Sequence, residues 1–164
     1  MALKKKFPYK AAVVACNGSC GATKDDPKCS YGCIGCGACV AACKFDAIHL
    51  NENGVAVVED EEKCIGCGAC ARKCPQQIIR VHECANYIVV KCSNRDKGAD
   101  ARRQCAVSCI GCGICQKTCT AGAIRVVENR AVIDDAYCLS CGMCSVKCPR
   151  HAIYDLRGVF TAKA

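Results

Sequence analysis

The spacing of the cysteines is the feature that most constrains what this chain of 164 residues can fold into. The pattern Cys-x-x-Cys-x-x-Cys-x-x-x-Cys occurs four times. Three thiolates on one tight loop can each reach a different iron atom of a cubane cluster, and the fourth typically ligates the other cluster of a pair. The pattern therefore predicts 4Fe-4S clusters and a protein that carries electrons. The four runs are Cys33-Cys36-Cys39-Cys43, Cys64-Cys67-Cys70-Cys74, Cys109-Cys112-Cys115-Cys119 and Cys138-Cys141-Cys144-Cys148.

The remaining composition offers little material for a hydrophobic core. The chain has no Trp, and only 5% of its residues are aromatic. Small domains with thin cores usually take part of their stability from metals or cross-links. Because ligand bonds form only in the folded state, we expect cluster binding to supply much of the folding free energy.

A secreted disulfide scaffold would also explain 22 cysteines. The regular cluster spacing argues against it, and so does the apolar stretch before Cys16, which is too short for the roughly 7–15 residues of a signal sequence. No stretch approaches the roughly 18–20 apolar residues of a membrane span. We therefore expect a protein of the reducing cytoplasm, alone or on the cytoplasmic face of a membrane complex.

The formal charge of +8 does not indicate a nucleic-acid partner. Each oxidised 4Fe-4S cube with its four thiolates carries about −2, so four of them offset the whole excess of positive charge. Zinc-stabilised nucleic-acid-binding modules use separated cysteine pairs, not four thiols within eleven residues, and no interleaving of aromatic and basic residues is present. We expect no nucleic acid among the partners.

An internal repeat sets the architecture. The offset that superimposes Cys16 on Cys92 also superimposes Cys29 on Cys105 and the first run on the third, and after a two-residue deletion Pro75 falls on Pro149. The repeat predicts two tandem two-cluster units, 1–83 and 84–164. Each should be α+β, with short β-hairpins and a short helix after each run. The expected strands are 12–15, 48–50, 55–58, 79–81, 87–91, 124–127 and 131–133.

Each unit resembles the bacterial-type two-cluster ferredoxin. The resemblance implies that the fourth cysteine of each run ligates the neighbouring cluster. Lys44 and Thr120 stand where that family commonly has Pro. The implied ligand sets are Cys33, Cys36, Cys39 and Cys74; Cys64, Cys67, Cys70 and Cys43; Cys109, Cys112, Cys115 and Cys148; and Cys138, Cys141, Cys144 and Cys119.

A closer resemblance extends over nearly the whole chain. The segments Val14-Ala15-Cys16-Asn17-Gly18, Cys29-Ser30-Tyr31-Gly32-Cys33 and 90–98 are similar to the polyferredoxin region of the B subunit of the Rnf electron transport complex, without that family's membrane-anchoring helix or the cluster-binding segment that follows it. The resemblance implies an electron carrier that takes low-potential electrons from ferredoxin and passes them to a partner oxidoreductase. The alternative is a dedicated component of a soluble dehydrogenase, hydrogenase or bifurcating complex. Whether the chain is a fragment or a soluble paralogue stays open.

Six cysteines lie outside the four runs, and four of them belong to the repeat: Cys16, Cys29, Cys92 and Cys105. They could be buried thiols beside a cluster, replacements for a run cysteine such as Cys36 or Cys112, a shared fifth metal site, or the disulfides Cys16–Cys29 and Cys92–Cys105. Cys20 and Cys84 have no counterpart in the repeat, and we expect no role for them.

No residue of the sequence suggests catalysis. His49, His82 and His151 are isolated, every cysteine run is complete without them, and we expect packing or surface roles. No nucleotide or flavin motif is present. Electron transfer between clusters needs no acid, base or substrate pocket, so we expect an electron carrier rather than an enzyme. The acidic run 59–62 and several basic segments could dock redox partners through complementary charge.

Overall fold

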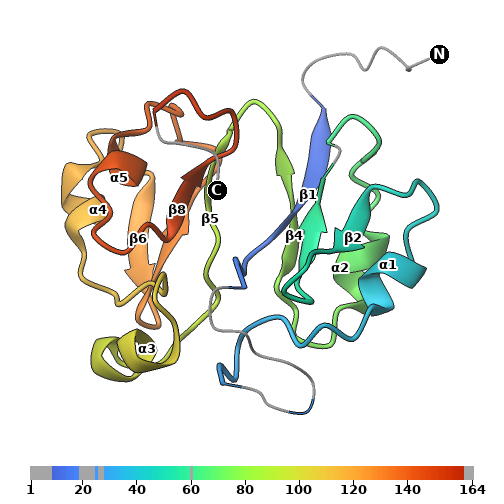
Figure 1. The fold of residues 1–164 in the computed structure, drawn as a ribbon. Helices are drawn as coiled ribbons and strands as arrows, with labels where there is room; N and C mark the ends of the chain where they lie inside the picture. Colours follow the sequence, from blue (N-terminus) through green and yellow to red (C-terminus); the bar gives the residue numbers. More distant parts are fainter. Residues whose placement is uncertain (1–8, 19–24, 26–27, 60, 161–164) are drawn as a thin grey trace.

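The computed structural model describes residues 9–18, 25, 28–59 and 61–160. Four two-stranded antiparallel sheets and five short helices make up this part of the chain (Figure 1). The α+β class that the sequence predicts is confirmed. Cys20 and Asp60 lie outside the described residues.

The first half is built on two antiparallel strand pairs. Strand β1 (Lys10–Val14) pairs with β4 (Ile79–Glu83), and β2 (Ile48–Leu50) pairs with β3 (Ala56–Val58). Four consecutive residues of β1, Ala11 to Val14, are buried, as expected of a strand that is covered on both faces. The β1–β4 pair closes the half, because it joins the segment before the first run to the segment after the second run.

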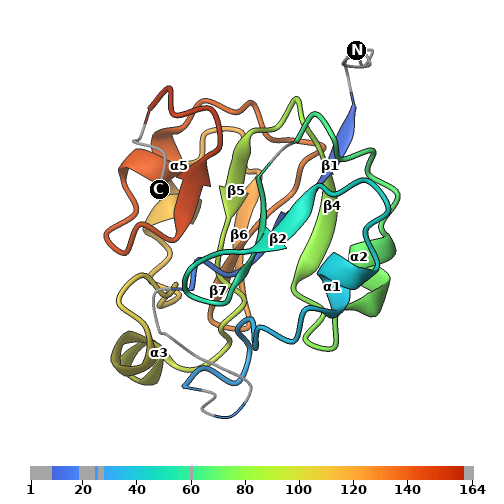
Figure 2. The same ribbon diagram turned by 45° about the vertical axis from the view of Figure 1, so that its right-hand side comes forward.

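The second half repeats this arrangement. Strand β5 (Ile88–Val90) pairs with β8 (Ile153–Asp155), and β6 (Ile124–Val127) pairs with β7 (Arg130–Ile133). Each half has its own core of small and β-branched side chains mixed with run cysteines, such as Ile48 and Cys39 in the first half and Ile124 and Cys115 in the second. Figure 2 shows the β1–β4 and β5–β8 pairs in the middle of the molecule, with the helices of the first half on one side and those of the second half on the other.

The helices lie inside the runs, so the expectation of helices after each run is wrong. They are α1 (Ala38–Ala41), α2 (Ala69–Lys73), α4 (Ile114–Thr118) and α5 (Met143–Val146). Each contains the third cysteine of its run and is preceded by a glycine in the left-handed conformation, for example Gly37 with φ 72°. One helical turn fits between the third and fourth cysteines. Helices this short are not stable alone, so their packing must hold them in place.

The longest helix, α3 (Gly98–Gln104), lies in the segment between β5 and the third run. Its Ala101 is fully buried, and the Ser108 hydroxyl donates a 2.6 Å hydrogen bond to the Ala101 carbonyl. No helix was expected from the sequence in this segment.

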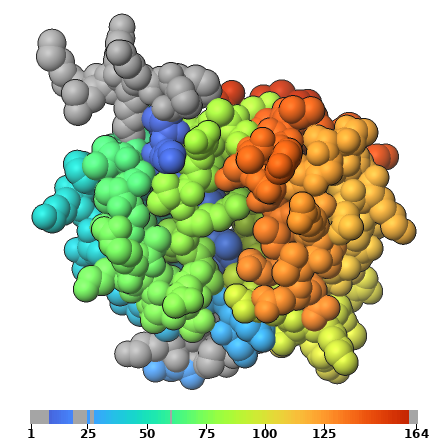
Figure 3. All heavy atoms as spheres, turned by 180° about the vertical axis from the view of Figure 1, so that it is seen from behind, coloured from blue at the N-terminus to red at the C-terminus, as the bar shows by residue number. Residues whose placement is uncertain are grey.

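The two halves are in direct contact (Figure 3). Cys16, just after β1, forms an antiparallel bridge with Cys92, just after β5. The Asn17 amide donates a 2.8 Å hydrogen bond to the Tyr154 hydroxyl. The contact is therefore made by equivalent segments of the repeat that meet about a pseudo-twofold axis.

Candidate iron–sulfur sites

The first half contains a hollow of about 340 Å³ lined by four thiols. Three of them, Cys33, Cys36 and Cys39, come from the first run, and the fourth, Cys74, comes from the end of the second run. The fold brings Cys74 there because α2 leads back to β4, which pairs with β1, and Val14 of β1 and Ile79 of β4 both line the hollow. Apolar side chains complete the wall: Val14, Ile34, Leu50, Ile78 and Ile79.

The second half repeats this hollow at about 350 Å³. Cys109, Cys112 and Cys115 again come from one run, and Cys148 comes from the next. The thiol of Cys115 interacts electrostatically with those of the other three, and burial is the main cause that raises the pKa of Cys115 to about 11. In both halves, therefore, the fourth cysteine stands beside the three thiols of the other run.

The cysteines of the second and fourth runs form two further sets of thiols. The thiol of Cys70 interacts electrostatically with Cys64 of its own run and with Cys43 of the preceding run. The thiol of Cys144 interacts with Cys138 and Cys141, and burial is the first cause that raises its pKa to about 12. Of the remaining members, Cys67 belongs to the same run as Cys64 and Cys70, and Cys119 at the end of α4 packs against the core that contains Cys144.

Backbone N–H groups point at the sulfur atoms. Ala56 of β3 donates to Cys33 Sγ at 3.5 Å, and its counterpart Ala131 of β7 donates to Cys109 Sγ at 3.3 Å. Ala12 of β1 donates to Cys64 Sγ at 3.3 Å. Such donors favour thiolate over thiol and tune the reduction potential of a bound cluster.

In two of the four runs, the residue four positions after the fourth cysteine is a further donor. Ala47 N–H reaches Cys43 Sγ at 3.5 Å, and Ala152 N–H reaches Cys148 Sγ at 3.4 Å. Burial alone would raise the pKa of Cys43, but the N–H groups of Ala47 and Phe45 lower it below the usual value. Ala47 and Ala152 are apolar residues that were not predicted as site residues from the sequence. Their role as N–H donors was missed, because any residue except Pro can fill it.

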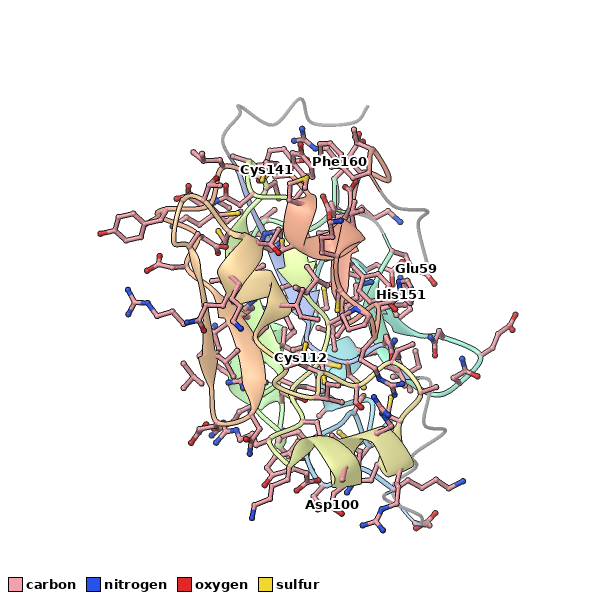
Figure 4. All side chains as sticks on the ribbon, turned by 90° about the vertical axis from the view of Figure 1, so that its left-hand side faces the viewer. Glu59, Asp100, Cys112, Cys141, His151 and Phe160 are labelled. Atoms are coloured by element: carbon pink, nitrogen blue, oxygen red, sulfur yellow. The ribbon has the colours of Figure 1, made fainter. Side chains whose placement is uncertain are left out.

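Exposure follows the same order in every run. The second cysteine is exposed, as in Cys36, Cys67, Cys112 and Cys141, whereas the third is buried on its helix. Figure 4 shows Cys112 and Cys141 well apart in the second half, with Cys141 near Phe160. A group held by each thiol set would be covered by apolar side chains except near its second cysteine.

The donor chemistry fits 4Fe-4S clusters. The sets that contain Cys33 and Cys109 combine four thiols from two runs, apolar walls and backbone N–H donors, which are the groups that hold and tune such clusters. The described residues contain no helix long and apolar enough to cross a membrane.

The six extra cysteines are distributed unequally. Cys16, Cys29, Cys92 and Cys105 line one hollow at the seam between the halves, whereas Cys84 is buried at the turn between β4 and β5. The structure joins neither Cys16 to Cys29 nor Cys92 to Cys105 by a disulfide.

Comparison with known proteins agrees with this description. The family description "4Fe-4S dicluster domain" matches residues 32–78 and again residues 108–153. The chain therefore belongs to the dicluster ferredoxin family, with two such domains that bind four 4Fe-4S clusters. It is an electron-transfer protein of the ferredoxin type, as its sequence predicts.

Curated relatives define its place within that class. The chain is 44% identical over 144 residues to the B subunit of the Na(+)-translocating ferredoxin:NAD(+) oxidoreductase complex of Acetobacterium woodii, covering 88% of this chain and 41% of that protein. It is 46% identical over 110 residues to the B subunit of the proton-translocating ferredoxin:NAD(+) oxidoreductase complex of Clostridium ljungdahlii, covering 67% of this chain and 38% of that protein. It is 41% identical over 144 residues to the B subunit of the ion-translocating oxidoreductase complex of Methanosarcina acetivorans, covering 88% of this chain and 52% of that protein. The resemblance to the B subunit of the Rnf complex is confirmed, and the chain spans about half or less of the length of these relatives.

Proposed function

We propose that the chain relays low-potential electrons from a reduced ferredoxin, through its clusters, to a component of a partner oxidoreductase complex. The observation that carries this proposal is the set of four thiol groups, each buried at its third cysteine and exposed at its second. Support for the partners comes from the relatives, two of which are named as the B subunit of ferredoxin:NAD(+) oxidoreductase complexes.

The ligand sets that we propose are those of the two-cluster ferredoxin. Support for exchange of the fourth cysteine comes from Cys74 beside Cys33 and Cys39, and from Cys43 beside Cys70. We also propose the division into units 1–83 and 84–164, since the pairs β1–β4 and β5–β8 each form within one half. A cytoplasmic location agrees with thiol ligands, which persist in reducing compartments.

The residues of this chain position, insulate and tune the redox groups. A bound 4Fe-4S cluster supplies the exchange of one electron. The thiols hold it, and side chains such as Ile79 and Ile153 exclude water from it. The N–H groups of Ala56 and Ala131 stabilise negative charge on the sulfur atoms. Exchange of the fourth cysteine places the two thiol sets of each half side by side, so electrons can pass without a bound substrate or a proton donor.

One end of the relay offers a contact surface for a redox partner. Around the exposed Cys141, Leu139 is 75% exposed and Met143 is 46% exposed, and Tyr137 and Val146 are also exposed. Apolar side chains around an exposed ligand would let a partner approach closely and exclude water. We propose this surface, over α5 and the loop before it, as one docking site.

Anaerobic stopped-flow spectroscopy tests the proposal. The cluster-loaded chain is mixed with a two-cluster ferredoxin that has been reduced with dithionite, and the loss of visible cluster absorbance is followed. Wild-type chain should be reduced rapidly, and Cys67→Ser should accept one electron fewer and pass electrons on more slowly. Cys84→Ser, which changes a buried cysteine outside the runs, is the control and should behave as wild type. Failure of ferredoxin to reduce the wild-type clusters, or an unchanged rate in Cys67→Ser, would contradict the relay.

A further inference from the structure

A third thiol-lined hollow lies at the seam between the halves, away from the four runs. Cys16 and Cys29 of the first half and Cys92 and Cys105 of the second half all line it. These four are the extra cysteines that the repeat places at equivalent positions, so two repeat-related pairs meet in one place.

The pair from the first half converges on Gly32. A Cβ atom at that position would lie 3.6 Å from Cys29 Sγ and 3.7 Å from Cys16 Sγ, so both sulfur atoms face the same glycine. Gly32 itself lines the hollow. A side chain at this position would occupy space next to both thiols, which is a reason for glycine there.

The pair from the second half is similarly close. The thiol of Cys92 interacts electrostatically with that of Cys105. The Cys109 N–H donates a hydrogen bond to Cys92 Sγ at 3.2 Å, the same kind of contact that sulfur atoms receive in the four run sites. The two pairs are held together by the backbone bridge between Cys16 and Cys92.

Polar residues form other walls of the hollow. Lys91 lines it, with its ammonium nitrogen 4.9 Å from the centroid of the Tyr154 ring. Asn17, Ser93 and Asn94 also line it, and their side chains donate hydrogen bonds to Tyr154, Tyr31 and Gln104, respectively.

The residue types at the seam are those of an iron–sulfur site. Four cysteines, two from each half, line one hollow. A cubane cluster takes four thiolates, each of which binds a different iron atom.

We propose that Cys16, Cys29, Cys92 and Cys105 bind a fifth iron–sulfur cluster, shared between the two halves of the chain. This proposal goes beyond the four-cluster relay, because a fifth cluster at the seam would connect the clusters of the first half with those of the second half. The seam site is next to the first run through Gly32 and Cys33, and next to the third run through Ser108 and Cys109. A reduced cluster in one half would give up one electron to the seam cluster and be oxidised by one. The seam cluster would then pass that electron to the other half and return to its oxidised state.

Iron and acid-labile sulfide are measured on the full chain, purified anaerobically and reconstituted with iron and sulfide. The wild-type chain should contain about 20 iron atoms, whereas the four runs alone account for about 16. Cys16→Ser and Cys105→Ser should each lose about four irons, although they change different halves. The double variant should lose no more than either single variant, because both cysteines serve one cluster. Cys84→Ser should keep the wild-type iron content.

The readouts separate this proposal from the four-cluster relay. Electron paramagnetic resonance of the dithionite-reduced chain should show one set of reduced-cluster signals lost in Cys16→Ser and in Cys105→Ser alike. About 16 irons in wild type, unchanged in both variants, would overturn the fifth site and leave the relay intact. Additive losses in the double variant, or zinc in place of four of the irons, would also overturn it. A wild-type chain with little iron would refute the relay itself.

Discussion

Replacement of Gly35 by Ala should weaken the first run much more than replacement of Gly37, although both glycines lie in the same loop. Both have left-handed backbone, with φ 65° and φ 72°, so an alanine at either position costs about 1–2 kcal/mol. A Cβ on Gly37 would meet nothing within 4 Å, whereas a Cβ on Gly35 would lie 2.6 Å from the carbonyl oxygen of Gly54. That oxygen belongs to the turn between β2 and β3, and forcing the turn to move adds about 1–3 kcal/mol.

The expected total is therefore about 2–5 kcal/mol for Gly35→Ala against about 1–2 kcal/mol for Gly37→Ala. Because unfolding of a protein with bound clusters is not a simple two-state equilibrium, the appropriate measurement is a rate. Loss of visible cluster absorbance in guanidinium chloride should be about 5- to 150-fold faster for Gly35→Ala than for Gly37→Ala, if the whole difference of about 1–3 kcal/mol between the two variants appears in the unfolding rate.

The second half offers an independent repeat of the comparison. A Cβ on Gly111 would lie 2.9 Å from the Asn129 carbonyl oxygen, whereas a Cβ on Gly113 would meet nothing within 4 Å. Gly111→Ala should again be the more damaging change. Equal rates within either pair, or a faster loss in Gly37→Ala or Gly113→Ala, would show that contact with the hairpin turn does not limit these loops.

Three further results are expected. Removal of iron with a chelator under reducing conditions should unfold most of the chain, as followed by far-ultraviolet circular dichroism, because much of the folding free energy comes from the ligand bonds; retention of the native spectrum would contradict this. Burial lowers the pKa of His82 below its usual 6.5, so the unfolded chain protonates this imidazole more readily than the folded chain, and stability should fall as the pH drops through 6.5. In His82→Gln the rate of cluster loss should rise less over that pH range than in wild type. Parallel pH profiles of the two proteins would contradict this role of His82. Burial would raise the pKa of Asp155, but backbone N–H groups, first that of Phe160 at 2.6 Å, lower it overall. Asp155→Asn should therefore speed cluster loss at pH 7, and the difference from wild type should shrink as wild-type Asp155 becomes protonated at low pH. A difference independent of pH would refute the role of its charge.

The sequence was sufficient for the features that depend on local spacing. The spacing of the runs predicted 4Fe-4S clusters, and the two dicluster-domain matches agree with it, whereas the individual ligand sets stay a prediction. Strands such as β2 and β6 were predicted with the correct bounds, because β-branched residues and turn signals flank them closely. The turn at Glu128 and Asn129 has positive φ at both residues, as expected of a two-residue hairpin connection that takes the place of Asn53-Gly54.

Features that depend on contacts between distant segments could not be predicted in this way. The approach of Gly35 to Gly54, the N–H of Ala12 at Cys64 and the hydrogen bond from Ser108 to Ala101 join residues whose side chains carry no pattern that identifies the partner. Helix α3 is mostly polar and short, so its position depends on the burial of Ala101 rather than on a strong amphipathic repeat. From the sequence, a shared metal site was one of several possible roles for Cys16, Cys29, Cys92 and Cys105. Only the contact between the two halves shows that these four cysteines line one hollow.

Duplication also constrains how this chain can give electrons a direction. Two copies of one unit begin with equivalent sites, and equivalent sites have equal reduction potentials, so any gradient must come from positions where the halves differ. One such position is the first cysteine of the second run in each half: Cys64 accepts an N–H from Ala12 of β1, whereas Cys138 accepts one from Ser140 of its own loop. Hydrogen bonds to the sulfur atoms and solvent exposure both shift cluster potentials. The proposed thiol set around Cys64, which accepts an N–H from β1, and the set around Cys138, next to the exposed Leu139, should therefore differ in reduction potential.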